Sequence, residues 1–281
     1  VDNRIKDINV GIDAHSITDH TQGNWNGIVG KIILKTTPKI YFDDIQVYPD
    51  LSNKKAVVKM VLKSTSSTAT PVHLKINAQS FNSDKVHTLT PISHDYIMKK
   101  GILNCEMVLE MGNNMLTWDE FNPALYKLTA ELTNGKKKEV KQIQFGMREF
   151  AIKGKWFYVN GRQTQLRGTV ECCTFPLTGY PPTDVKSWER IFRICRSSGL
   201  NHIRFHSYCP PEAAFIAADL VGIYLQPEGP AWPNHGVRLG NGAPIDKYLM
   251  DETIRLTREY GNYASYCMLA SGNEPSGNWV A

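Results

Sequence analysis

Apolar and polar residues alternate along the first half of the chain in short stretches that predict β strands. The stretches cover residues 28–34, 40–48, 55–63, 72–80, 102–110, 125–132 and 139–145. In Val72-His73-Leu74-Lys75-Ile76 every second residue is apolar, which places one face of a strand inward. Turn formers such as Pro49-Asp50 and Asn134-Gly135 separate the stretches. Short strands with regular turns are typical of a β sandwich.

After about residue 147 the pattern changes to short strands that alternate with helices. Strands are expected at residues 165–168, 202–206, 223–226 and 266–269. The first helix begins after the capping residue Asp184 and ends at Gly199, and two further helical stretches end near Gly222 and Gly261. Repeated strand–helix units predict a parallel sheet, either doubly wound or a (β/α)8 barrel. A barrel needs roughly 250 residues, so the chain would supply about half of one.

Composition and charge exclude several classes of function. The 281 residues suggest two domains, and the content of 42% apolar and 21% charged residues is ordinary for a soluble globular protein. The net charge is +5, and the longest basic run, Lys136-Lys137-Lys138, follows a turn signal. We therefore expect a solvated turn there and no nucleic-acid partner. No run of 18 apolar residues occurs, so no membrane span is expected.

The termini and the cysteines leave the compartment open. Val1-Asp2-Asn3-Arg4 does not form a signal peptide, but a secreted, periplasmic or surface protein whose signal was removed would look the same. Six cysteines are present without Cys-x-x-Cys spacing, which argues against a zinc or thioredoxin-type site. We expect the adjacent Cys172 and Cys173 to be structural, because neighbouring residues cannot form a relaxed disulfide.

Chemically active side chains follow each of the four expected parallel strands. In parallel βα folds, functional groups gather at the carboxyl ends of strands. Glycoside cleavage requires two carboxylates, one to protonate the leaving oxygen and one to attack or stabilise the anomeric carbon. A carboxyl group in an aromatic-rich cleft can have a raised pKa and act as the acid. In chain order, the side chains at these strand ends are Glu171, Arg204, His206, Glu228, Asn273 and Glu274.

Each candidate also has a structural interpretation. Glu274 could cap a loop or pair with Arg204, and Arg204 could belong to a buried ion pair. His206 could be a core histidine, and Glu228 could face solvent. Trp232 could be a core aromatic or a platform on which a sugar ring stacks.

Six short sequence elements follow one another along the chain. They are Gly23–Gly30, Trp118–Tyr126, Phe145–Phe150, Phe157–Gly168, Gly199–Arg204 and Gly272–Glu274. In this order and spacing they resemble glycoside hydrolase family 2, which contains β-galactosidases, β-glucuronidases and β-mannosidases. Each element is weak alone, but the ordered set is specific and covers essentially the whole chain.

The resemblance implies a fold in three parts. Residues 1–37 would be the remnant of a jelly-roll sugar-binding domain, and residues 38–147 an immunoglobulin-like β sandwich. Residues 148–281 would be the first half of a catalytic (β/α)8 TIM barrel. The family's nucleophilic glutamate lies near the end of the seventh barrel strand, beyond Ala281. The chain is therefore expected to be a fragment that lacks full turnover alone, with uncovered apolar edges that favour self-association or marginal stability.

The resemblance also implies an activity and roles for residues. The activity is that of a retaining glycosidase, of β-galactosidase or β-glucuronidase type, that cleaves a terminal β-linked sugar of an oligo- or polysaccharide by double displacement. Glu274 would be the acid/base, Asn273 would bind the hydroxyl at carbon 2, and Arg204 would help to hold this strand end. The remaining candidates for substrate contact are His206, Glu228 and Trp232.

Three departures from the family pattern limit what can be carried over. The run Gly168–Cys173 lacks the histidine that family β-galactosidases carry after Arg-Gly, and His206 sits one position earlier than their histidine. The pair His235-Gly236 lacks the acidic magnesium ligand expected just before it. We therefore assign no metal ligand and no certain cofactor, since the ligands for a divalent cation such as magnesium are incomplete.

A different class of function fits part of the chain. The sandwich alone could be a non-catalytic carbohydrate-binding or adhesion module. Such a module would not need Asn273-Glu274 at the end of a strand, so the role of this pair distinguishes the two hypotheses.

Overall fold

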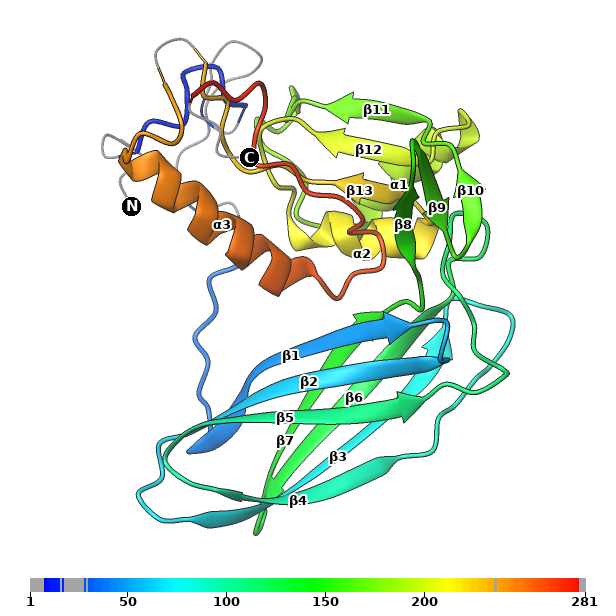
Figure 1. The fold of residues 1–281 in the computed structure, drawn as a ribbon, viewed down its shortest axis with the longest axis vertical. Coiled ribbons are helices and arrows are strands. Elements are labelled where there is room, and N and C mark those ends of the chain that lie inside the picture. The colour runs from blue at the N-terminus through cyan, green and yellow to red at the C-terminus, as the bar shows by residue number, and fades with distance from the viewer. Residues whose placement is uncertain (1–7, 16, 18–27, 29, 235–236, 278–281) are drawn as a thin grey trace. The chain divides into compact units, whose positions relative to one another are not determined.

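The computed structural model describes residues 8–15, 17, 28, 30–234 and 237–277. They form two compact units, shown in Figure 1. The sandwich unit comprises Ile33–Gln165 with Asn262–Ala264, and the parallel-sheet unit comprises Val1–Ile32, Leu166–Gly261 and Ser265–Ala281. The jelly-roll element at residues 23–30 lies mostly outside the described residues. The division at 1–37, 38–147 and 148–281 stays a prediction.

The sandwich unit contains two antiparallel sheets that pack face to face (Figure 1). One sheet has the order β1-β2-β5, formed by Ile40–Asp50, Lys55–Ser64 and Gly101–Glu110. The other has the order β4-β3-β6-β7, formed by Ile92–Met98, Thr70–Phe81, Leu125–Asn134 and Lys137–Phe145. Leu62 of the first sheet and Leu74 and Ile76 of the second are fully buried in the shared core. Burying each such side chain contributes roughly 1.5–3 kcal/mol.

The alternating pattern predicted most of these strands but not all. The strands expected at 40–48, 55–63, 72–80, 102–110, 125–132 and 139–145 are confirmed. The stretch at 28–34 is not a strand in its described residues, and Ile32 and Leu34 are 81% and 97% exposed. The pattern misses β4, an edge strand beside β3, because its residues do not alternate and it exposes apolar as well as polar side chains, with Ile97 62% exposed. An edge strand can leave such side chains in solvent, so burial imposes no period-2 pattern on it.

A tight turn joins β6 and β7 where Asn134-Gly135 predicts one, with Gly135 and Lys136 as its two central residues. Asn134 pairs with Lys137 across a two-residue connection, and Gly135 has a φ of 56°. Glycine adopts this left-handed conformation without steric cost. Lys136, Lys137 and Lys138 are exposed, as expected for a solvated turn.

A small antiparallel sheet, which the sequence pattern did not predict, follows the sandwich. It has the order β10-β9-β8, formed by Arg162–Thr164, Trp156–Val159 and Phe150–Lys153. The chain enters it past Gly146, where a Cβ atom would lie 2.7 Å from the Cβ of Ala264 and 2.8 Å from the Cβ of Trp118. Trp118 is fully buried, and its backbone N–H donates to the carbonyl of Met147 at 2.9 Å. Close packing therefore requires glycine at position 146.

The parallel-sheet unit is built from strand–helix repeats. β11 (Gly168–Glu171), β12 (His202–Phe205) and β13 (Tyr224–Gln226) are parallel and neighbours in sequence order. α1 (Val185–Ser197) and α2 (Glu212–Val221) connect them, and α3 (Pro244–Tyr260) follows β13. β11 begins three residues later than the sequence pattern predicted. The fourth strand expected at 266–269 is not a regular strand, but parallel bridges join Leu225 to Tyr266 and Glu228 to Ala270.

The helix ends follow the capping signals in the sequence. The Asp184 carboxylate accepts a hydrogen bond from the backbone N–H of Ser187 at 2.9 Å at the start of α1. Gly222 ends α2 with a φ of 84°. The apolar face of α1 is buried, and Trp188 packs edge-on against Phe205 of β12. This packing fixes which face of β12 is turned toward the helices and which toward the polar groups described below.

We expect Gly146→Ala to destabilise the sandwich unit by roughly 1–3 kcal/mol, the usual range for overpacking a core. The added methyl group would displace Ala264 or the buried Trp118. Urea unfolding followed by circular dichroism measures the change. Gly30→Ala is the control, because nothing lies within 4 Å of a Cβ atom at that position. Equal midpoints for both variants would contradict the packing requirement.

Candidate active site

Arg204 is the centre of a polar network at the carboxyl ends of the parallel strands. Its Nε donates to Oε1 of Glu228, and its Nη2 donates to Oδ1 of Asn273 at 2.7 Å. The second oxygen of Glu228, Oε2, accepts from the backbone N–H of Ser207 at 2.8 Å. The side chain of Glu228 is 1% exposed, whereas that of Arg204 is 30% exposed. The network therefore joins β12, the residues after β13 and the segment that bridges to β13.

This geometry decides between several interpretations of the sequence. Arg204 forms an ion pair with the buried Glu228, which is the structural role considered for it from the sequence. Glu228 does not face solvent, because both of its oxygens accept hydrogen bonds inside the protein. Arg204 pairs with Glu228 and Asn273, and Glu274 instead accepts a hydrogen bond from Trp232. A buried carboxylate is tolerated when a cation and N–H donors compensate for its lost hydration, as they do here.

A cluster of three rings lies beside Glu274. The indole Nε1 of Trp232 donates to Oε2 of Glu274 at 2.9 Å. The Trp232 ring packs edge-on against His206, with centroids 4.7 Å apart, and His206 packs edge-on against His15 at 4.6 Å. The backbone N–H of His15 donates to Oγ of Ser207 at 2.8 Å. The structure therefore brings together the predicted residues His206, Trp232 and Glu274 and adds His15.

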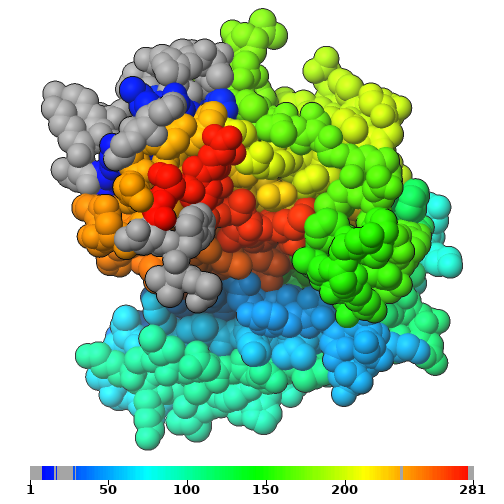
Figure 2. All heavy atoms as spheres, turned by 45° about the horizontal axis from the view of Figure 1, so that its top comes forward, coloured from blue at the N-terminus to red at the C-terminus, as the bar shows by residue number. Residues whose placement is uncertain are grey.

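Sequence reasoning missed His15 because it lies 192 residues before Ser207, which it contacts. The segment 8–15 is held against the loop that follows β13. The backbone N–H of Trp232 donates to the carbonyl of Val10 at 2.8 Å. Val10 and Ala14 belong to a buried apolar cluster with Ala231. Figure 2 shows residues 8–15 in blue on the same face as the orange loop after β13 and the red segment before residue 277. No motif in residues 8–15 signals this contact.

Burial keeps the two histidines neutral. It lowers the pKa of His15, and the neighbouring His206 lowers it further. Burial also lowers the pKa of His206, with a further contribution from the positive charge of Arg204. Among the described residues, the buried Nδ1 of His206 has no hydrogen-bond partner. Near neutral pH this ring is therefore an uncharged group with an unused polar atom.

The backbone is strained at the ends of the parallel strands. Cys173 after β11, Ser207 after β12 and Glu274 after the bridged segment have φ angles of 57°, 52° and 39°. Left-handed conformations cost non-glycine residues roughly 1–3 kcal/mol each and tend to occur at functional sites. Close backbone packing sustains this geometry, because a Cβ atom at Gly229 would lie 2.3 Å from the carbonyl oxygen of Ser271.

Glu171, at the end of β11, belongs to the helix-facing side of the sheet. It pairs in register with Phe205, so both side chains lie on the same face. Its Oε1 accepts from the backbone N–H of Thr174 at 3.3 Å, and its Oε2 is buried without a hydrogen-bond partner among the described residues. Burial raises the pKa of Glu171 to about 7. Burial also raises the pKa of Cys172, as does the nearby Glu171, so this thiol stays protonated.

The residues that the structure describes do not form a site for a divalent cation. In the described part of the chain, no group of three or more His, Cys, Asp and Glu side chains is arranged to hold a metal ion. Glu228 uses both oxygens on Arg204 and Ser207. The predicted pair His235-Gly236 lies outside the described residues. We therefore derive no chemical step through a metal.

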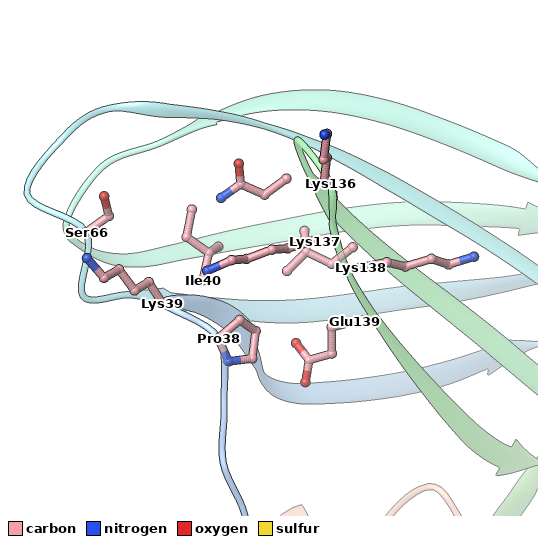
Figure 3. Close-up of a pocket in the computed structure, with 10 residues that line it drawn as sticks. Pro38, Lys39, Ile40, Ser66, Lys136, Lys137, Lys138 and Glu139 are labelled. Carbon is pink, nitrogen blue, oxygen red and sulfur yellow. The ribbon is translucent and has the colours of Figure 1, made fainter.

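The sandwich unit carries a hollow lined by several lysines, which differs in composition from the site around Arg204 and Glu274. Figure 3 shows Lys39, Lys137 and Lys138 around it, and its volume is about 270 Å³. Glu139, which also lines it, accepts from the backbone N–H of Phe42 at 2.9 Å. Lys138 pairs with Glu131 on the neighbouring strand at 3.0 Å. The hollow lacks the two unengaged carboxylates that glycoside cleavage requires.

Comparison with known proteins identifies the relationship. Residues 40–148 match the model of glycosyl hydrolases family 2. The resemblance to this family is confirmed. A β-galactosidase of Oenococcus oeni is 22% identical over 265 residues, which cover 91% of this chain and 26% of that protein. A β-glucuronidase of Sus scrofa is 24% identical over 270 residues, which cover 90% of this chain and 37% of that protein.

Solved structures of family 2 proteins share the fold. A crystal structure of the Parabacteroides merdae β-glucuronidase aligns with a TM-score of 0.67 at 19% identity, covering 86% of this chain and 30% of that one. The chain thus spans about a quarter to two fifths of the length of these relatives. None of the helices in the described part of the chain has the length and apolar character needed to cross a membrane.

We expect Glu171→Gln to remove a pH dependence of stability. The folded-state pKa of about 7 exceeds the ordinary value of 4.5, so folding favours the protonated carboxyl group. The cost of ionising it is absent below about pH 4.5, grows as the pH rises to 7 and reaches roughly 3 kcal/mol above that. Urea unfolding at pH 5 and pH 8 measures the difference. The Glu171→Gln substitution should stabilise the protein selectively at pH 8, whereas the exposed Glu106→Gln control should behave alike at both.

We expect Arg204→Met to destabilise the parallel-sheet unit by roughly 3–5 kcal/mol, because it leaves the Glu228 carboxylate buried without its cation. Adding Glu228→Gln should restore much of this loss, since the amide oxygen can still accept from Ser207. Chemical unfolding of both single variants and the double variant gives the coupling free energy. A double variant whose loss equals the sum of the two single losses would show that the two side chains are not coupled.

Proposed function

We propose that this chain is part of a retaining family 2 glycosidase that cleaves a terminal β-linked sugar, with Glu274 as the acid/base. The supporting observation is the placement of Asn273 and Glu274 after a parallel segment beside β13, where Arg204 holds the asparagine and the Glu274 carboxylate is exposed. The relatives that support this class are named β-galactosidase and β-glucuronidase. The second carboxylate of the double displacement is not assigned in this chain.

Glu274 acts twice in this mechanism. In the first step its protonated carboxyl group gives the proton to the departing glycosidic oxygen while a nucleophilic carboxylate forms the covalent glycosyl intermediate. In the second step the ionised Glu274 takes a proton from the incoming water, which releases the sugar. The exposure of its carboxylate allows both the leaving group and the water to reach it.

Arg204 sets the orientation of Asn273 for substrate binding. The Oδ1 atom of Asn273 accepts from Arg204, so its Nδ2 is the atom that can donate to a sugar hydroxyl. We assign this donor to the hydroxyl at carbon 2. Glu228 acts indirectly, because both its oxygens are engaged and its contribution is to hold Arg204.

His206 and Trp232 line the same place. The ring of His206 packs edge-on against Trp232 and helps to shape this surface, and its own Nδ1 is buried. The indole of Trp232 offers an apolar face for a sugar ring in addition to its bond with Glu274. Together these side chains form a substrate-binding surface around Glu274.

The strand order supports a barrel. β11, β12, β13 and the bridged segment lie side by side in sequence order. A doubly wound sheet reverses this order at a switch point, where its ligand binds, whereas a (β/α)8 barrel does not. We propose that these are the first four strands of such a barrel and that the sandwich is the family's immunoglobulin-like domain.

We expect Glu274→Gln, made in the complete natural protein, to lower kcat/KM for a poor leaving group such as a disaccharide by about 10²–10⁴-fold. Activated aryl β-glycosides should lose much less, because their leaving groups need little protonation. A panel of β-galactosides, β-glucuronides and β-mannosides identifies the sugar.

Glu110→Gln is the matched control, since Glu110 is exposed on β5 and pairs with Lys55 at the surface. It should leave both substrates unaffected. Unchanged hydrolysis of the poor leaving group by Glu274→Gln would refute the assignment and leave the carbohydrate-binding module as the better hypothesis.

A further inference from the structure

The hydrogen bond from Trp232 to Glu274 connects two loops that meet at the site. Trp232 follows β13, and Glu274 follows the segment that bridges to β13. The backbone supports the same contact, because Asn273 N–H donates to the carbonyl of Ala231 at 2.9 Å. A Cβ atom at Gly272 would lie 2.6 Å from that carbonyl oxygen. The two loops are therefore held in contact immediately beside both side chains.

The indole is in turn held by rings from two other segments. His206, after β12, packs edge-on against Trp232, and His15 packs edge-on against His206. His15 also lies tilted against Trp232, with centroids 5.8 Å apart, and is only 7% exposed. The backbone of His15 is fixed by its bond to Ser207 Oγ. The orientation of the indole thus depends on a segment far away in the sequence.

We propose that Trp232 is a positioning residue for Glu274 and that His15, acting through the ring cluster, holds Trp232 in place. This inference rests on the proposed function of Glu274. It adds that the position of Glu274 depends on a residue in the segment 8–15. The cluster His15–His206–Trp232 acts as one packed support for a single N–H group.

A single donor on Glu274 has two chemical consequences. An N–H group that bonds to a carboxylate holds it in one orientation, and the ionised form it bonds to is the form that takes a proton from water in the second step. The bond also occupies Oε2 and leaves Oε1 to carry the proton toward the glycosidic oxygen. The donor therefore determines which oxygen of Glu274 carries the proton and how readily this carboxylate is protonated.

Other charged and titratable groups also lie near Glu274 in the part of the chain that the structure describes. His206 is the titratable neighbour, and burial lowers its pKa so that it stays neutral. Arg204 on β12 and Glu228 after β13 form a pair whose charges balance. Asp13, on the same segment as His15, acts on His15 and raises its pKa by less than burial lowers it. The indole N–H is thus the described group that bonds directly to Glu274.

Kinetics against pH tests the role of the N–H group. Trp232→Phe, made in the complete natural protein, keeps a ring but removes the donor, so the ionised carboxylate of Glu274 loses a stabilising bond. The alkaline limb of kcat/KM for a poor leaving group should therefore move upward relative to the parent.

His15 is tested by a double-variant cycle. His15→Ala should move the alkaline limb in the same direction by a smaller amount, whereas His15→Phe, which keeps a packed ring, should stay close to the parent. Adding His15→Ala to Trp232→Phe should cause no further shift, because His15 acts through the indole. Additive shifts would overturn the role given to His15.

Nuclear magnetic resonance tests the contact without catalysis. The indole ¹H–¹⁵N signal of Trp232, assigned by its loss in Trp232→Phe, should titrate with pH in the parent and stop doing so in Glu274→Gln. Trp188 is an internal control, because its indole donates to the carbonyl of Pro182 at 2.7 Å and should not respond.

The outcomes separate the two proposals. If Glu274→Gln impairs poor leaving groups but Trp232→Phe leaves the alkaline limb in place, the proposed function stands and this inference is wrong. If Glu274→Gln has no kinetic effect, the proposed function fails, and the titration of the Trp232 signal still decides whether the contact exists. An indole signal unaffected by Glu274→Gln would overturn the contact itself.

Discussion

The parallel-sheet unit depends on one buried charge and its compensation. Glu228 is almost fully enclosed, and a carboxylate in such a place would normally be neutral or absent. Arg204 and the backbone of Ser207 make its ionised form tolerable. Because the guanidinium is rigid and planar, the same group reaches Asn273 with a second donor and so fixes the end of the bridged segment. Burying the ion pair costs free energy, and the same pair places the segment that carries the candidate acid/base.

Glu274 is held differently from its neighbour Asn273. Its carboxylate stays at the surface and receives an indole N–H from a loop supported by two histidine rings. Burial keeps these rings neutral, so they support the indole without adding charge beside the carboxylate. An ionic network thus holds Asn273, and an uncharged ring cluster supports the indole that donates to Glu274.

Local patterns predicted elements well where one face of a strand or helix is buried. The alternation in β3 and the apolar face of α1 follow from burial on one side, and Asp184 and Gly222 mark helix ends for local reasons. The same logic failed where burial is not one-sided. The edge strand β4 exposes apolar as well as polar side chains and shows no alternation, and the apolar stretch at 28–34 remains exposed in its described residues.

In the candidate site, too, the sequence determined local features and the tertiary structure determined the long-range contacts. The sequence by itself determined which polar residues stand at the ends of the parallel strands, Arg204, Glu228 and Asn273-Glu274 among them, because strand position is a local property. Only the tertiary structure decided that Glu228 is buried against Arg204 and that Trp232 bonds to Glu274. It also decided that His15 joins the cluster, since a contact across nearly two hundred residues is set by packing between segments and leaves no periodic trace in the chain.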